Sequence, residues 1–219
     1  MKKALAFLMA AVMLMSMLTA CGNKDNAADT NDADNNNVNT EETDKAAADK
    51  VAALIDAIYV QERTEETDAQ CEAAKAAWDA LTDAQKALVE GEEASPDYFG
   101  LDTGDASKDD PRNQDEIGEK ELLVVSFGTS FNDSRVADIK SVEDALQEAN
   151  PDWSVRRAFT AQIIINHIQA RDGEKIDNMD QALERAVANG VKQLVVQPTH
   201  LMHGAESVSY THLRAHETC

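Results

Sequence analysis

The sequence predicts an α/β protein in which a three-stranded parallel sheet of βαβ units follows a small all-α module. Three short apolar runs, 122–127, 153–159 and 191–197, are typical of buried strands, and helical patterns separate them. Alternating strands and helices of this length favour right-handed connections, which produce parallel sheets. Before residue 92, apolar residues recur at helical spacing, and this pattern predicts the all-α module.

Net charge and cysteine content exclude two classes of protein. The 219 residues include 20 Lys and Arg against 41 Asp and Glu, a formal net charge of −21. Nucleic-acid binding needs a basic surface, so we expect no nucleic-acid partner. Three cysteines are too few for a disulfide scaffold. The acidic excess is concentrated in residues 21–120, where 27 acidic residues accompany 9 basic ones, as is typical of a solvated segment.

The N-terminal residues 1–20 have the pattern of a secretory signal peptide, because two lysines precede an apolar run too short to span a membrane. The run ends in Leu-Thr-Ala-Cys21, which resembles a bacterial lipobox. In that pattern the peptide is cut before the cysteine and the thiol receives a lipid. We therefore expect an exported lipoprotein, anchored to the extracytoplasmic face of the membrane through Cys21. The alternative is an ordinary signal peptide with a chance cysteine.

The C-terminal residues 208–219 resemble one reading frame of a sequencing adapter. The resemblance covers the whole run VSYTHLRAHET, so we expect an artefactual tail and a natural sequence interrupted near Glu206 or Ser207. A genuine polar terminus is the alternative. The histidines and the glutamate of this tail have the side chains of metal ligands, and we assign them no function.

A tether and a helical module are expected between the signal and the sheet. Residues 21–44 are rich in Asn, Asp, Ala and Thr and cannot bury enough surface to fold, so we expect a disordered tether. Within 45–91, capping-box patterns at Thr67 and Thr82 predict two helix starts after a first helix. The stretch 74–89 resembles a helical module common in surface proteins of Gram-positive bacteria, which implies a spacer or docking role.

Cys71 and Trp78 of this module are better explained as core residues than as catalytic or ligand-binding residues. We expect Trp78 to lie in the core and Cys71 to be a small buried residue, because the segment has no histidine to activate a thiol. Residues 92–120 are predicted to be an acidic loop or linker. Their aspartates lack the spacing of an EF-hand loop, which favours a solvated loop over a calcium site. These aspartates are Asp102, Asp105, Asp109 and Asp110.

The predicted α/β half-domain comprises residues 121–207. An amphipathic helix is expected over 133–149, and a second from Thr160 to Arg171. A third helix is expected to begin after a cap at Asp177. The apolar face of this third helix is expected to include Met179, Leu183 and Val187.

Two candidate sites follow strands of this half-domain. The turn Ser126-Phe127-Gly128-Thr129-Ser130 is small and hydroxylated, and its backbone N–H groups could cradle a carboxylate or phosphate. A tight strand-to-helix turn without a ligand is the alternative. After the third strand, His200, His203 and Glu206 form a candidate divalent-metal or proton-transfer cluster, and a packing role is the alternative for each histidine. Both candidates lie at the carboxyl ends of parallel strands, where such sheets bind ligands.

Five motifs in this region resemble CbiK-type anaerobic cobaltochelatases in order and approximate spacing. The resemblance covers residues 121 to about 207 and no part of the chain before it. The motifs are LLVVSFGTS from Leu122, RAFT from Arg157, III from Ile163, RDG from Arg171 and VVQPTH from Val195.

The resemblance implies a class II chelatase that inserts Co2+ into sirohydrochlorin during anaerobic cobalamin biosynthesis. It implies a fold of two similar, flavodoxin-like α/β halves around a cleft, with no organic cofactor. It places the main metal ligands in a second half that would follow Glu206. For His200 it therefore implies only a supporting role. The resemblance thus implies a tetrapyrrole as substrate and Co2+ as substrate metal. It also implies that the 219-residue chain, without the second half, is inactive.

Two other functions remain open at this stage. An exported protein of the same fold could bind haem, another tetrapyrrole or a metal ion without catalysis. A surface-adhesion lipoprotein would explain the helical module, although the chelatase resemblance argues against it. The assembly of subunits into a homo-oligomer is also left open.

The lipobox pattern yields a direct prediction about Cys21. We expect a fatty-acid analogue to label the wild-type protein and to leave Cys21→Ala unlabelled, because the thiol is the acceptor of the lipid. Gel fluorescence of membrane fractions measures the label. Equal labelling of both proteins would contradict the assignment.

Overall fold

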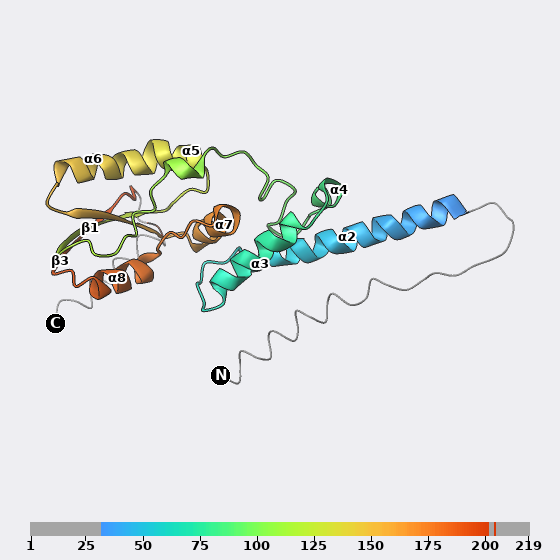
Figure 1. Cartoon of the computed structure of the whole chain (residues 1–219), viewed down its shortest axis with the longest axis horizontal. Coiled ribbons are helices and arrows are strands. Elements are labelled where there is room, and N and C mark those ends of the chain that lie inside the picture. The colour runs from blue at the N-terminus through green and yellow to red at the C-terminus, as the bar shows by residue number, and fades with distance from the viewer. Residues whose placement is uncertain (1–31, 202–203, 205–219) are drawn as a thin grey trace, which may run out of the picture. The chain divides into compact units, whose positions relative to one another are not determined.

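The computed structural model describes residues 32–201 and 204, with side chains from residue 40 onward. Its elements run from one long helix through two short helices to three strands that alternate with helices (Figure 1). In these described residues, no helix is long and apolar enough to cross a membrane. The predicted signal, Cys21, His203, Glu206 and the predicted artefactual tail all lie outside the described residues.

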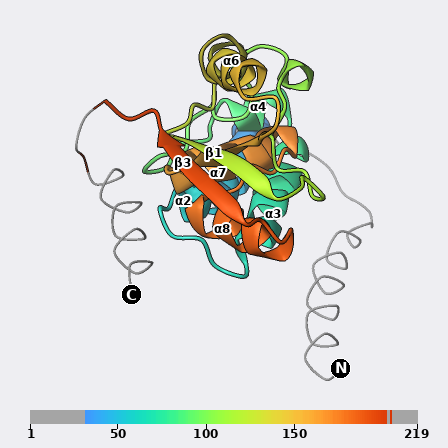
Figure 2. The same ribbon diagram turned by 90° about the vertical axis from the view of Figure 1, so that its left-hand side faces the viewer.

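The three strands form one parallel sheet, as the sequence predicts. Strand β1 (Lys120–Ser126) lies between β2 (Ser154–Phe159) and β3 (Gln193–Pro198), and both pairings are parallel. Figure 2 shows β1 and β3 side by side. Because the strands are parallel, their carboxyl ends meet at one edge. The α/β assignment is therefore confirmed.

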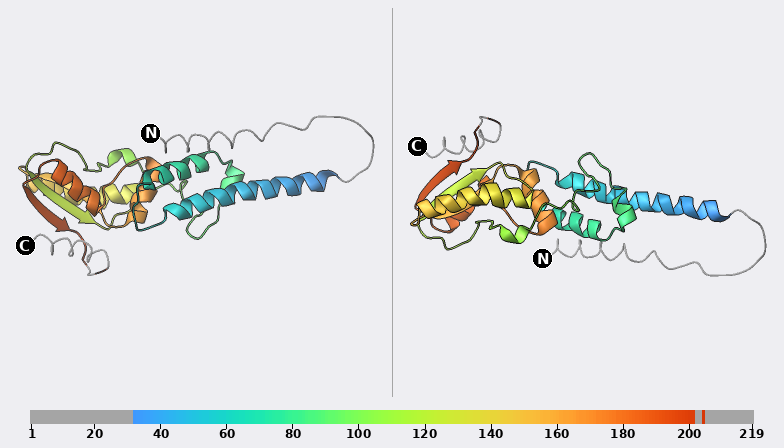
Figure 3. Two further views of the ribbon diagram at one scale, coloured as in Figure 1. Left: turned by 90° about the horizontal axis from the view of Figure 1, so that it is seen from below. Right: turned by 90° about the horizontal axis from the view of Figure 1, so that it is seen from above.

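Helices cover both faces of this sheet. Side chains of a strand alternate between its faces, so Leu122 and Val124 pack on one side and Leu123 and Val125 on the other. The first pair packs with a residue of α6 (Ser141–Ala149), and the second pair packs with residues of α8 (Met179–Ala188). The two views of Figure 3 show these helices on opposite sides of the sheet.

The helices follow the predicted order, with local differences in their boundaries. The helix expected over 133–149 consists of α5 (Asn132–Ser134), the π-helical segment η3 (Arg135–Lys140) and α6. Helix α7 (Gln162–Asp172) ends at Gly173 in the left-handed conformation. Asp177 does not cap α8: Asn178 does, in a reciprocal capping box with Gln181.

The predicted boundary between tether and module is wrong in the structure. Helix α2 (Asp32–Ile58) begins inside the segment 21–44 that we expected to be disordered. Among its residues from 40 onward, Ala48 is the first that is buried. Once this packed part has formed, each further turn adds backbone hydrogen bonds at low cost, so a polar segment without Gly or Pro continues the helix.

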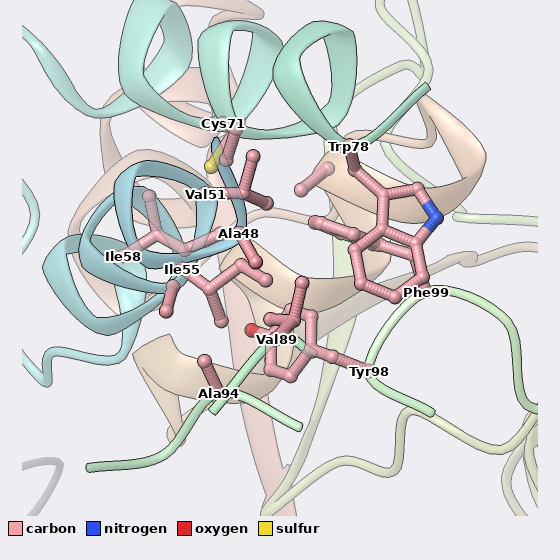
Figure 4. Close-up of a cluster of buried hydrophobic side chains, with 13 residues drawn as sticks. Ala48, Val51, Ile55, Ile58, Cys71, Trp78, Val89, Ala94, Tyr98 and Phe99 are labelled. Atoms are coloured by element: carbon pink, nitrogen blue, oxygen red, sulfur yellow. The ribbon is translucent and has the colours of Figure 1, made fainter. Parts of the chain in front are cut away.

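The module has its own core, to which α2, α3 (Thr67–Asp79) and the loop after α4 (Asp83–Lys86) contribute. Trp78 and Phe99 meet edge to face with ring centroids 5.6 Å apart (Figure 4). Trp78 is therefore a core residue, as expected. The capping box at Thr82 is confirmed, whereas α3 starts one residue earlier than its pattern implies: Glu66 is at the N-cap position, and Thr67 is buried inside the helix.

The segment 92–120, expected to be an acidic loop or linker, is packed along much of its length. It contains one short helix, η2 (Ala106–Lys108), and contributes Tyr98 and Phe99 to the module core. Farther along, Asp109 is buried against the sheet half and accepts hydrogen bonds from two arginines. We call residues 102–116 the strap, because they run between the module and the sheet half while making contacts with the latter.

Polar contacts attach the module to helix α7. The side chain of Asn166 donates to the backbone carbonyl of Ile58 over 2.9 Å, and the Cys71 thiol donates to the carbonyl of Asn166. Gln169 donates to Asp68 over 2.8 Å. Burial raises the pKa of the Cys71 thiol to about 11, so this cysteine is a packed residue rather than a nucleophile.

His167 gives this attachment a pH dependence that can be measured. Its ring stacks on Tyr98 with centroids 4.1 Å apart, and its Nε2–H donates to the carbonyl of Tyr98 over 2.7 Å. Burial lowers the pKa of His167 to about 4, below the usual value of 6.5. The unfolded chain therefore binds a proton at a higher pH than the folded one, and stability falls as pH drops from about 6.5 to 4.

We predict that His167→Gln flattens this acid dependence. The wild type should lose up to about 3 kcal/mol more than the variant between pH 7 and pH 4, because only the wild type must bury a protonated imidazole or unfold. Urea unfolding at several pH values measures the free energy of each protein. Parallel curves for the two proteins would contradict the prediction.

Candidate functional site

The carboxyl edge of the sheet brings together three segments that are distant in the sequence. These are the turn after β1, Thr160 after β2, and Thr199 with His200 after β3. Thr160 N donates to the carbonyl of Ser126, and Thr199 N donates to the carbonyl of Val125, both over 2.9 Å. The two predicted sites, the turn and His200, therefore lie at one edge.

The turn 126–130 depends on a glycine. Gly128 has a φ of +101°, a conformation that other residues adopt only with strain. A β-carbon at this position would lie 2.6 Å from the ring of Phe159, which is fully buried. Gly128 therefore allows the turn to pass directly over the end of β2.

Two arginines hold the carbonyl groups of this turn. Arg135 donates to the carbonyl of Thr129 over 3.2 Å, and Arg171 donates to that of Ser130 over 2.7 Å. Among the described residues, nothing accepts a hydrogen bond from the backbone N–H groups of residues 128–130. The carbonyls of Thr129 and Ser130 are thus hydrogen-bonded to arginines, whereas the N–H groups of residues 128–130 are available. This arrangement gives the turn the polarity of an anion-binding site.

The side chains around the turn divide into a structural and an exposed set. Ser126 is buried, and its hydroxyl accepts from that of Thr199 over 3.0 Å, so it supports the edge rather than facing a ligand. Thr129 accepts a hydrogen bond from Phe131 N. Phe127 and Phe131 are 44% and 48% exposed and flank the turn with apolar surface. A flat, apolar ligand that carries carboxylates fits this combination.

His200 connects the ends of β2 and β3. Its Nε2 lies 3.3 Å from the hydroxyl of Thr160, and the tautomer of the ring decides which atom donates. His203 and Glu206 lie outside the described residues, so the predicted metal cluster is not tested by the geometry. Within the part of the chain that the structure describes, no group of three His, Cys, Asp or Glu residues could hold a metal ion.

Thr160, Arg135 and Arg171 were not among the site residues predicted from the sequence. Thr160 follows β2 directly, so the rule that ligands bind at the carboxyl ends of strands could have identified it. No local pattern indicated that Arg135 and Arg171 reach the turn, because both belong to helices that begin after it. Their contacts depend on how those helices pack.

The residues of this edge lie in a region that is similar to known proteins. Residues 120–214 match the cobalt chelatase (CbiK) family. The matching region contains the turn, Thr160 and His200. A sirohydrochlorin cobaltochelatase of Salmonella typhimurium is 41% identical over 88 residues, which are 40% of this chain. The chain spans about one third of the length of this curated relative, since the match covers 33% of it.

The resemblance of the α/β region to CbiK-type cobaltochelatases is thus confirmed for part of the chain. The match begins at residue 120, where β1 starts, so the helical module and the strap precede it.

Gly128 offers a test of the turn geometry. We predict that Gly128→Ala lowers the free energy of unfolding by about 2–4 kcal/mol, because it adds backbone strain and a clash with Phe159. Gly173→Ala is the matched control: Gly173 has a φ of +72° and open space around it. That control should cost only about 1–2 kcal/mol. Chemical denaturation measures both, and equal losses would contradict the role of the clash.

Proposed function

We propose that this protein acts in cobalt insertion into sirohydrochlorin and that its α/β region forms one wall of the tetrapyrrole site. The observation that carries the proposal is the location of the turn, Thr160 and His200 at one edge, inside the region that matches the cobalt chelatase family. The relative named for this activity supports the choice of substrate.

The residues of the edge suit the chemistry of such a reaction. Co2+ is a substrate: it forms bonds to the four pyrrole nitrogens, and two pyrrole protons leave. No electron transfer occurs, so the proposed reaction needs no organic cofactor. The N–H groups of residues 128–130 would bind substrate carboxylates, and Phe127 would contact the ring. A neutral His200 would accept a proton, with Thr160 orienting the imidazole.

The metal itself requires ligands beyond the described residues. His200 could supply one ligand, but a divalent ion needs at least two or three. His203 and Glu206 are the nearest further candidates in the sequence. Because the chain spans about one third of its relative, we propose that a complementary region supplies the remaining ligands. We therefore expect the 219-residue chain to bind the macrocycle without accelerating insertion.

A second candidate function is capture of haem or another tetrapyrrole by an exported lipoprotein. The turn and the exposed aromatic residues suit binding, and the described residues hold no metal cluster. The predicted lipid at Cys21 would place this protein on the extracytoplasmic face of the membrane, which is an unusual location for a biosynthetic step. Membrane anchoring and export belong to this proposal and to the first alike.

Spectroscopic titration tests the proposed binding. Sirohydrochlorin should shift its absorbance on addition of the wild-type chain, and Gly128→Ala should weaken this binding about tenfold or more, because the turn loses its geometry. The control Gly173→Ala should bind as the wild type does. Tighter binding of haem than of sirohydrochlorin would favour the second candidate, and no binding of either would contradict both.

A chimera tests catalysis. The 88 matching residues of this chain would replace their counterparts in the Salmonella relative, which supplies the rest of the site. We expect cobalt insertion above the spontaneous rate, followed by the absorbance of the cobalt complex. His200→Ala in the chimera should lower kcat about tenfold or more with little change in KM, as expected for a proton acceptor. A folded chimera at the spontaneous rate would contradict the proposal.

A further inference from the structure

We propose that the strap is a built-in part of the anion-binding edge and that Asp109 is a positioning residue for the turn 126–130. Asp109 acts through Arg135, which holds the carbonyl of Thr129. The strap precedes the region that matches the chelatase family, so this protein uses a segment outside that region to shape the site. The identity of the ligand rests on the proposed function, whereas the positioning itself does not.

Asp109 is paired with two buried arginines. Its Oδ2 accepts from Arg135 Nε over 2.6 Å and from Arg157 over 2.7 Å, and its Oδ1 accepts from Arg157 over 2.9 Å. The side chains of all three residues are fully buried. Burial alone would raise the pKa of Asp109, but the hydrogen bonds and charges of Arg157 and Arg135 outweigh it and hold that pKa below its usual range. The carboxylate is therefore ionised at neutral pH.

Arg135 passes this constraint on to the turn. While its Nε is held by Asp109, its NH1 donates to the carbonyl of Thr129, and its NH2 donates to Asn132 over 2.6 Å. Glu174 lies 3.2 Å from the same NH2. A planar guanidinium held at three corners has one orientation, so the Thr129 carbonyl is fixed. The Ser130 N–H belongs to the same trans peptide and therefore points in the opposite direction.

The strap reaches the turn by a second route. The carbonyl of Thr103 accepts from Asp133 N over 2.8 Å, and the carbonyl of Gly104 accepts from the side chain of Asn132 over 3.2 Å. The Oδ1 of Asn132 in turn accepts from Arg171, the residue that holds the carbonyl of Ser130. Both carbonyls of the turn that arginines hold are therefore connected to the strap.

Glu143 provides a matched comparison with Asp109. Both carboxylates are buried and both bind Arg157 through two hydrogen bonds. Glu143 also lies 3.4 Å from Arg112, but these two described residues, Glu143 and Arg135, form no hydrogen bond or ion pair with each other. Loss of either carboxylate leaves a buried guanidinium short of a partner, so both changes should destabilise the fold. Only loss of Asp109 should disturb the turn.

The test compares Asp109→Asn with Glu143→Gln in the full chain. Hydrogen exchange measured by mass spectrometry follows the backbone amides of residues 131–135, where Phe131 N donates to the Thr129 hydroxyl and Asp133 N donates to the carbonyl of Thr103 in the strap. Absorbance titration follows sirohydrochlorin binding. We expect Asp109→Asn to raise exchange in this segment about tenfold and to weaken binding about tenfold. Glu143→Gln should change either quantity by no more than about twofold. Equal effects of the two variants, or no effect of Asp109→Asn, would overturn the proposal.

A second variant covers the case in which Asp109→Asn does not fold. Arg135→Lys keeps the positive charge beside Asp109, but a single ammonium group lacks the planar fork that reaches Thr129 and Asn132 together. Faster exchange at residues 131–135 in this variant supports the proposal, and wild-type exchange refutes it. If the wild type fails to bind sirohydrochlorin, the proposed function fails, while the exchange data still decide the role of Asp109.

Discussion

The pairing of Arg157 with two buried carboxylates is the constraint on which the sheet half depends. Arg157 lies in the middle of β2, opposite Val124 of β1, and its side chain is fully buried. A guanidinium in that position is stable only with good partners, and Asp109 and Glu143 each give it two hydrogen bonds. Glu143 comes from α6, but Asp109 comes from the strap. The strap must therefore lie against the outer side of β2, where Arg157 N also donates to the carbonyl of Arg112.

Local pattern predicted the sheet but not this network. The apolar runs identify three strands, because burial on both faces leaves a continuous apolar sequence, and the helical spacers indicate that the strands are parallel. The strap escaped prediction because its five aspartates look alike in sequence. Asp105 caps a short helix at the surface, whereas Asp109 is buried, and 48 residues separate it from Arg157. The sequence could have predicted that a carboxylate partner exists, because an arginine inside a buried strand needs one.

The same division between local and long-range information holds for the candidate site. The turn 126–130 and His200 could be placed at one edge, because every parallel strand ends there. The orientation of the turn could not be predicted, since it depends on Arg135 and Arg171 from two helices that approach it from outside the strands. Ser126 is the opposite case, because the sequence predicted it as a ligand-binding residue. In the structure its hydroxyl is buried and accepts a hydrogen bond from Thr199 instead.

The two outer strands of the sheet differ in a way that bears on the proposed cobalt insertion. The free side of β2 is covered by the strap and by residue 177, whose carbonyl accepts from Phe159 N. In the described part of the chain, no such segment covers β3, and Val195 in it is 46% exposed. His200 follows this strand, so its surroundings on that side depend on whatever pairs with β3. The proposed cobalt insertion would require the exclusion of water around the metal. Under that proposal, the edge near β2 is covered by the strap, whereas enclosure of the imidazole would depend on a segment that covers β3.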